Sequence, residues 1–148
     1  MPEIDTDSDD GDWEYALTVP NDARAVPIGR RTLRLILTAH GLPHLAEAAE
    51  LIATELVANA VQHTKGPAAL RLRWSARTWV LRIGVWDTDP TPPSLTPAPT
   101  AATALDSSGR GLALVREEAD TWGWYGLGRA QPPYTGGKFV WCELTRAA

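Results

Sequence analysis

Hydrophobic and polar residues alternate along five short segments of the chain, which is the period of a β-strand that buries one face. In the second segment Leu70 and Leu72 fall on one side, and Arg71 and Arg73 fall on the other. The alternation predicts five strands, in which the second pairs with the third and the fourth with the fifth as hairpins. The predicted strands cover residues 13–19, 68–74, 79–87, 121–127 and 137–144.

Three other segments have the spacing of helices whose apolar residues share one side. The first follows an Asn-Asp turn at residues 20–22 that would cap its N-terminus, and it ends near Ala39, before a glycine and a proline. The second runs from about residue 44 to 63, and the third opens at a glycine turn at 108–111. The order β-α-α-β-β-loop-α-β-β predicts an α+β fold: a mostly antiparallel mixed sheet with helices packed on one face.

Residues 88–108, between the third strand and the third helix, contain five prolines and show no periodicity. A connection of about 20 residues inside a compact domain is usually functional or disordered. We therefore treat this loop as a candidate part of a binding site.

The chain has 148 residues, of which 44% are hydrophobic, and this composition is typical of one globular domain with a single core. No apolar run approaches the ~20 residues of a membrane span. The first residues lack the basic and apolar regions of a signal peptide, so we expect a cytoplasmic protein with no membrane partner. The one cysteine, Cys142, lies in an apolar strand and should be a buried thiol.

Charge is concentrated at one end of the chain. Six of the 18 acidic residues precede Trp13, and no Lys or Arg accompanies them. Residues 1–12 are therefore predicted to be a disordered acidic tail ahead of a domain at 13–148. The domain itself contains 12 acidic and 14 basic residues. No basic stripe with interleaved aromatic residues is present, so we expect no direct contact with nucleic acid.

The second predicted helix carries polar residues at the border of its apolar face. Glu55, Asn59 and Gln62 are four and three residues apart and share one stripe. An amide oxygen is a neutral ligand suited to Mg²⁺, and a carboxylate one turn away can take a proton from a hydroxyl. Each also has an ordinary interpretation, as an amide packed at a helix edge and a solvated glutamate.

Two further places could contact a ligand. Asp87 ends the third strand, where its carboxylate could accept a hydrogen bond from an exocyclic amine or close an Asx turn. Gly109 and Gly111 flank Arg110 at the start of the third helix. Such glycines let backbone N–H groups approach phosphate oxygens, and the arginine would add a charged contact. The alternative is an ordinary glycine turn before a helix, whose apolar face begins at Leu112.

Four segments in this order carry a family resemblance: ELVANAVQHT (55–64), VWD (85–87), SGRGLALVREEAD (108–120) with a following WG, and GGKFVW (136–141). Together they resemble the ATP-binding domain of the gyrase, histidine-kinase and mismatch-repair superfamily. More closely, they are similar to its short stand-alone bacterial branch, the anti-sigma-factor serine/threonine kinases. The resemblance extends from about residue 13 to 144.

The resemblance implies ATP and Mg²⁺ as cofactors. It implies that Asn59 binds the Mg²⁺, that Glu55 is the general base, and that Asp87 accepts a hydrogen bond from the adenine amino group. It implies that the nucleotide is held by residues 109–112, which are Gly109, Arg110, Gly111 and Leu112. It also implies that residues 88–108 form a lid over the nucleotide. The implied partners are a sigma factor and an antagonist protein whose hydroxyl is phosphorylated.

The chain departs from the family pattern at two places. Prolines follow Asp87 where the family usually has glycines, and they remove N–H donors and fix φ. In the last strand Lys138 and Phe139 stand where a hydroxyl residue is common. An alternative is therefore a non-catalytic interaction module with a degenerate nucleotide site. A third option, a detached histidine-kinase-like domain, would need a partner that carries the phospho-acceptor histidine.

All seven tryptophans lie in predicted strands and should mostly fill the core or cover the sheet. Tryptophans on the helix-free face would form an apolar patch that marks a partner or homodimer surface. His63 lies on the same helical side as Asn59, at the polar end of the helix.

Overall fold

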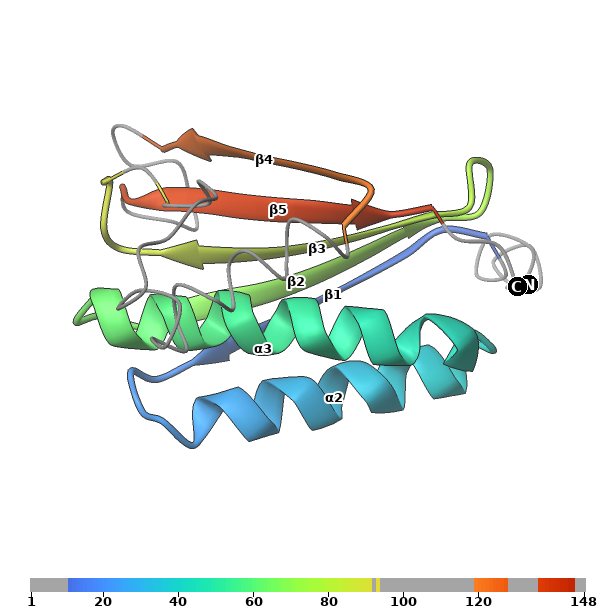
Figure 1. The fold of residues 1–148 in the computed structure, drawn as a ribbon, viewed down its shortest axis with the longest axis horizontal. Helices are drawn as coiled ribbons and strands as arrows, with labels where there is room; N and C mark the ends of the chain where they lie inside the picture. Colours follow the sequence, from blue (N-terminus) through green and yellow to red (C-terminus); the bar gives the residue numbers. More distant parts are fainter. Residues whose placement is uncertain (1–10, 92, 94–118, 128–135, 146–148) are drawn as a thin grey trace, which may run out of the picture.

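The computed structural model describes residues 11–91, 93, 119–127 and 136–145. The elements are β1 (Trp13–Val19), α2 (Ala25–Ala39), η1 (Pro43–Leu45), α3 (Ala46–His63), β2 (Ala68–Ser75), β3 (Val80–Asp87), β4 (Thr121–Gly126) and β5 (Lys138–Leu144). The five strands form one sheet in the order β1-β2-β3-β5-β4, and all neighbouring pairs are antiparallel. The helices cover one face of this sheet (Figure 1). The α+β prediction is confirmed, although no parallel pair, as a mixed sheet would need, occurs among these strands.

All five predicted strands and the first two predicted helices are present, with ends shifted by a few residues. Trp79 was predicted to begin the third strand, but it lies in the preceding turn at φ 58° and is half exposed. A left-handed backbone conformation cannot continue a strand, which therefore begins at Val80. Residues 1–10 of the acidic tail, residues 108–118 of the third predicted helix and most of the proline-rich loop lie outside the described residues.

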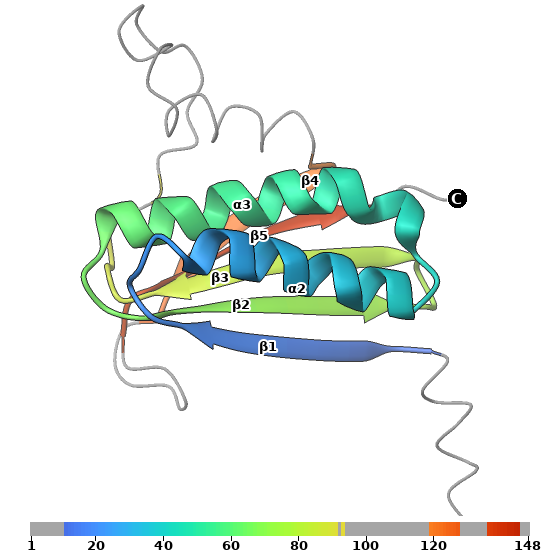
Figure 2. The same ribbon diagram turned by 90° about the horizontal axis from the view of Figure 1, so that it is seen from below.

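Helices α2 and α3 lie side by side over the same face of the sheet, as the view from below shows (Figure 2), and α3 contacts α2 as well as β2, β3 and β5. Alanines occupy much of its covered surface, so the neighbouring elements can approach closely. Its buried residues are Ala46, Ala48, Ala49, Ile52, Ala53, Leu56, Val57 and Ala60. Helix α2 contributes a narrower stripe at four-residue steps, namely Ala25, Gly29, Leu33 and Leu37. Polar side chains of α3 are therefore placed along the border of this buried face.

Asn21 holds the C-terminal end of α3 in place. Its Nδ2 donates to the backbone carbonyls of Val61 at 3.2 Å, Thr64 at 2.9 Å and Gly66 at 3.4 Å. These carbonyls lie in and just after the last helical turn, where intrahelical donors run out. In the segment 20–22, predicted to form a turn and cap the first helix, Asn21 thus binds the end of the other helix, while Asp22 Oδ1 accepts the Arg24 N–H at 2.8 Å just ahead of α2. Helix α2 begins only at Ala25 and has no side-chain cap.

The helix-free face of the sheet carries aromatic rings laid over glycines. A β-carbon on Gly84 would come within 2.2 Å of the Phe139 ring, and one on Gly123 within 2.4 Å of Trp141. The guanidinium of Arg82 lies 4.2 Å from the Trp141 ring centroid. Aromatic rings placed over glycines cover the strand backbone there and pack against it. The expectation that tryptophans cover the sheet is confirmed here, while a partner or homodimer surface stays a prediction.

We expect Asn21→Ala to lower the free energy of unfolding by about 1–2 kcal/mol, because carbonyls at the end of α3 lose their donor. Urea unfolding followed by circular dichroism measures the change. Asn59→Ala is the matched control, since the Asn59 side chain makes no hydrogen bond within the described residues. Its stability should stay within about 0.5 kcal/mol of the wild type. Equal stability of Asn21→Ala and the wild type would contradict the capping role.

Candidate functional site

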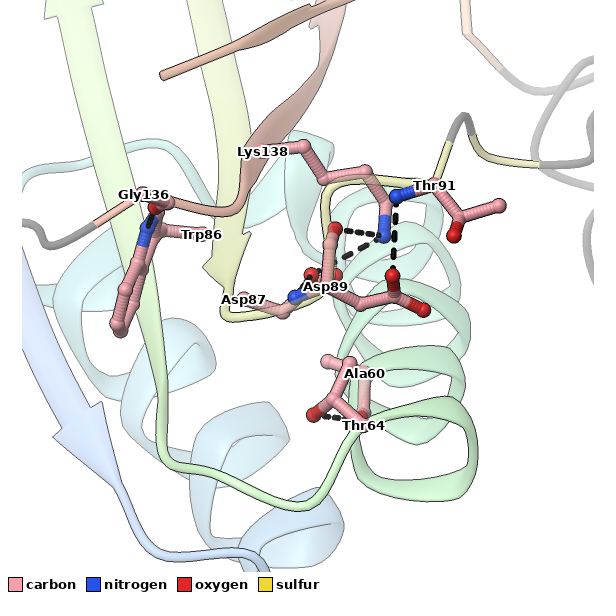
Figure 3. A network of polar contacts seen from close by, with 8 residues as sticks. All are labelled: Ala60, Thr64, Trp86, Asp87, Asp89, Thr91, Gly136 and Lys138. Atoms are coloured by element: carbon pink, nitrogen blue, oxygen red, sulfur yellow. Dashed lines mark hydrogen bonds and ion pairs between the residues drawn. The ribbon is translucent and has the colours of Figure 1, made fainter. Parts of the chain in front are cut away.

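Polar residues from three elements meet where β3 ends and β5 begins, beside the last turns of α3. Figure 3 shows Asp87, Asp89 and Lys138 next to the helical residues Ala60 and Thr64. The antiparallel pairing places Asp87 opposite Lys138 on neighbouring strands. The sheet therefore fixes this contact between residues 51 positions apart in the chain.

Asp87 and Lys138 form a buried ion pair. The Lys138 Nζ donates to Asp87 Oδ1 at 3.0 Å and to the Asp89 carbonyl oxygen at 2.9 Å. Each of the two paired side chains is only 4% exposed. A lysine is rarely buried to this degree without a partner, because an unpaired ammonium in a dry site is costly. The buried ammonium therefore needs the carboxylate to neutralise its charge, and the buried carboxylate needs the ammonium for the same reason.

The Asp87 carboxylate also closes a turn. Its Oδ1 accepts a hydrogen bond from the Asp89 N–H at 2.9 Å, two residues further on. The Asx-turn interpretation of Asp87 is therefore confirmed. Within the described residues both hydrogen bonds to this carboxylate end on Oδ1, which leaves Oδ2 for another donor. One side chain thus serves both the turn and the ion pair.

Burial raises the pKa of Asp87 more than the Lys138 ammonium and the Asp89 N–H lower it. The pKa of Asp89, which is accessible to solvent, is lowered by its hydrogen bonds to Thr91 and, more weakly, by the charges of Lys138 and His63. A β-carbon on Gly66, just after α3, would lie 2.8 Å from the Thr88 side chain, so the end of α3 lies close to the segment that follows β3.

The backbone before Lys138 can be made only with glycine. Gly137 has φ 85°, and a β-carbon there would lie 1.9 Å from the Asp87 carbonyl oxygen. The Trp86 indole Nε1 donates to the Gly136 carbonyl at 2.8 Å and holds the same turn (Figure 3). The two glycines and the indole thus bring β5 against the end of β3 and aim Lys138 at Asp87.

Glu55 and Asn59 lie one turn apart at the border of the buried face of α3, as the sequence predicts. Both are partly exposed. Neither side chain has a hydrogen-bond or ion-pair partner in the described part of the chain. Burial raises the pKa of Glu55. A carboxylate with a raised pKa and an amide without a described partner can both serve a ligand, and the same geometry also fits the ordinary interpretations, a packed amide and a solvated glutamate.

The proposed phosphate-binding turn lies outside the described residues. This applies to Gly109, Arg110, Gly111 and Leu112, and to most of the predicted lid at 88–108. Their roles stay predictions. Among the described residues no group of three or more His, Cys, Asp and Glu could hold a metal ion. A Mg²⁺ ion that keeps its water and binds phosphates needs few protein ligands, so the donor set around Asn59 fits it.

Lys138 is the site residue that sequence reasoning missed. The signal was the alternation of β5: Lys138 is in phase with Val140, Cys142 and Leu144, which all face the core. A lysine in phase with core residues needs a buried acid, and Asp87 ends another core strand. Cys142 itself is a buried thiol as predicted, and burial raises its pKa to about 12.

Comparison with known proteins gives the family. Residues 19–128 match the model of the histidine kinase-like ATPase domain, and the chain belongs to that family. It is also 43% identical over 74 residues to the uncharacterized protein SCO4941 of Streptomyces coelicolor, a match that covers 47% of this chain and 66% of the relative. The chain thus spans just under two thirds of that relative's length. Glu55, Asn59 and Asp87 lie inside the family match, whereas Lys138 lies beyond its end.

No helix in the described part of the chain is both long enough and apolar enough to cross a membrane.

We expect Lys138→Met to destabilise the fold by about 3–5 kcal/mol, because it leaves the Asp87 carboxylate buried without its cation. The pKa of Asp87 would rise further above its unfolded value of 3.8. An acid with a raised pKa disfavours the folded state at pH values above its unfolded pKa. The loss should therefore be larger at pH 8 than at pH 5.

Urea unfolding at the two pH values measures this effect, with the exposed Lys65→Met as the matched control. The double variant Asp87→Asn/Lys138→Met should recover much of the loss, since no unpaired charge remains. A pH-independent loss in Lys138→Met would argue against an uncompensated Asp87.

Proposed function

We propose that this protein binds Mg²⁺-ATP and acts as a protein serine/threonine kinase of the anti-sigma-factor type. The observation that carries the proposal is the pair Glu55 and Asn59. The two side chains lie one turn apart on α3, inside the family match, and have no partner in the described residues. A core helix whose carboxylate and amide have no partner among the described residues is well suited to a ligand.

Each residue has a chemical role in this proposal. The Asn59 amide oxygen would hold the Mg²⁺, which when bound offsets the charge of the phosphates. Glu55 would accept the proton of a serine or threonine hydroxyl, and its raised pKa makes it a better base than an exposed glutamate. Oδ2 of Asp87 would accept a hydrogen bond from the adenine amino group. Residues 109–112 would hold the phosphates through backbone N–H groups and Arg110.

The proposed partners come from the resemblance to anti-sigma-factor kinases. The protein would bind a sigma factor, or phosphorylate an antagonist protein that competes for it, as a monomer or homodimer. A cytoplasmic location is part of this proposal.

The second candidate is a non-catalytic interaction module with a degenerate nucleotide site. The observation in its favour is the buried pair at Asp87, because the carboxylate expected to take the adenine amino group already binds Lys138. The prolines that follow Asp87 favour the same candidate. Nucleotide binding and phosphoryl transfer must therefore be measured separately.

We expect wild-type protein to bind Mg²⁺-ATP, and Asn59→Ala to bind it at least about tenfold more weakly, because it loses a ligand to the cation–phosphate group. Calorimetry with the purified chain measures both. Glu47→Ala, at an exposed position in the first turn of the same helix, is the control and should bind like the wild type. No binding by the wild type at millimolar Mg²⁺-ATP would remove the nucleotide proposal.

We expect Glu55→Gln to keep ATP binding and lose phosphoryl transfer, since an amide preserves the shape but cannot take the proton. In the wild type, transfer should rise with pH through the pKa of Glu55, which lies above the ordinary 4.5. The assay follows radiolabel from ATP to the antagonist protein, with exposed Glu47→Gln as control. Equal transfer by Glu55→Gln and the wild type would eliminate Glu55 as the base, and ATP binding without any transfer would favour the non-catalytic module.

A further inference from the structure

The buried pair of Asp87 and Lys138 has unused hydrogen-bonding capacity on both partners. An ammonium has three N–H groups. Within the described residues the Lys138 Nζ uses two, toward Asp87 Oδ1 and the Asp89 carbonyl. The Asp87 carboxylate receives both of its bonds there on Oδ1. One N–H donor and one carboxylate oxygen acceptor thus remain on two side chains in direct contact.

A donor beside an acceptor matches the edge of a purine base at its sixth position. In adenine the amino group donates and the neighbouring ring nitrogen accepts. In 6-oxopurines such as guanine and hypoxanthine, the carbonyl oxygen accepts and the neighbouring ring N–H donates. A carboxylate alone offers only acceptors, whereas the pair of Asp87 and Lys138 offers both kinds of group. The pair offers the groups that either edge needs, with the base shifted along the pair for a 6-oxopurine, because its donor and acceptor stand in the opposite order.

We propose that Lys138 is a base-contacting specificity residue, and that the Asp87–Lys138 pair accepts purine nucleoside triphosphates with either a 6-amino or a 6-oxo group. This inference rests on the proposed nucleotide function, in which the base approaches Asp87. Both side chains are 4% exposed, so water is a poor substitute for a missing partner. A base that leaves either group unpaired there loses affinity.

The position of Lys138 is set by the fold and not by the ligand. Gly137 permits the close approach of β5 to the Asp87 carbonyl, and the Trp86 indole holds the Gly136 carbonyl. The ammonium is also tied to the Asp89 carbonyl. A preorganised donor costs little to use on binding, which favours a direct role for Lys138 in recognising the base.

The first test uses the wild-type protein with four ligands and Mg²⁺ in calorimetry: ATP, GTP, ITP and purine riboside triphosphate, which carries hydrogen at the sixth position. We expect GTP and ITP to bind within about tenfold of ATP. Purine riboside triphosphate should bind at least about tenfold more weakly, because it forfeits one charge-assisted bond.

Binding of ATP with GTP and ITP more than about 100-fold weaker would overturn this inference alone, since Asp87 would then select the amino group by itself. Absence of binding by all four ligands would overturn the proposed function and this inference with it. The two failures are thus distinguished in one experiment.

The second test separates base contact from a structural role. Lys138→Met should weaken ATP and ITP by at least about tenfold and leave binding of inorganic tripolyphosphate unchanged, because tripolyphosphate has no base. Lys65→Met should leave all three unchanged, and Lys138→Arg should keep ITP binding within about tenfold of the wild type, since it retains charge and donors. An equal loss of tripolyphosphate affinity in Lys138→Met would overturn the base contact. If Lys138→Met does not fold, Lys138→Arg and the wild-type ligand series decide the question.

Discussion

The packing of α3 against both α2 and the sheet is the constraint on which the rest of the structure depends. These two contacts bury one broad face of the helix, and alanines make the close approach possible. What remains is a border on which polar side chains reach solvent without entering the core. Glu55 and Asn59 lie on that border. The position of the candidate site thus follows from the packing of the helix, and Asn21 fixes the helix end beside it.

The contact between β3 and β5 supplies the other half of the site. Antiparallel pairing sets Asp87 opposite Lys138, and both lie on the face that the helices cover. A lone buried charge at either position would destabilise the fold, so the two residues depend on each other. The glycine at 137 is part of the same arrangement, because any side chain would collide with the Asp87 carbonyl. Strand pairing, turn geometry and charge neutralisation therefore act on one small region.

The two candidate functions give this region different meanings. For a kinase, Glu55 and Asn59 are the informative residues, because neither has a partner in the part of the chain that the structure describes. For a non-catalytic module, the informative contact is the ion pair that already satisfies part of Asp87. The two observations are compatible, because one N–H of Lys138 and Oδ2 of Asp87 have no partner among the described residues. With these groups the pair can persist while a base binds, and Lys138 would then change which base is accepted.

Local patterns in the sequence were enough to predict the five strands, the first two helices, the α+β class and the helix border of Glu55 and Asn59. Alternation and helical spacing arise between residues that are close in the chain. Each period appears because the strand or helix buries one of its faces. The tertiary structure alone decided that Asn21 caps α3 and that Lys138 binds Asp87. Those contacts join residues some 40 to 51 positions apart. Strand order and register, which no local pattern encodes, brought them together.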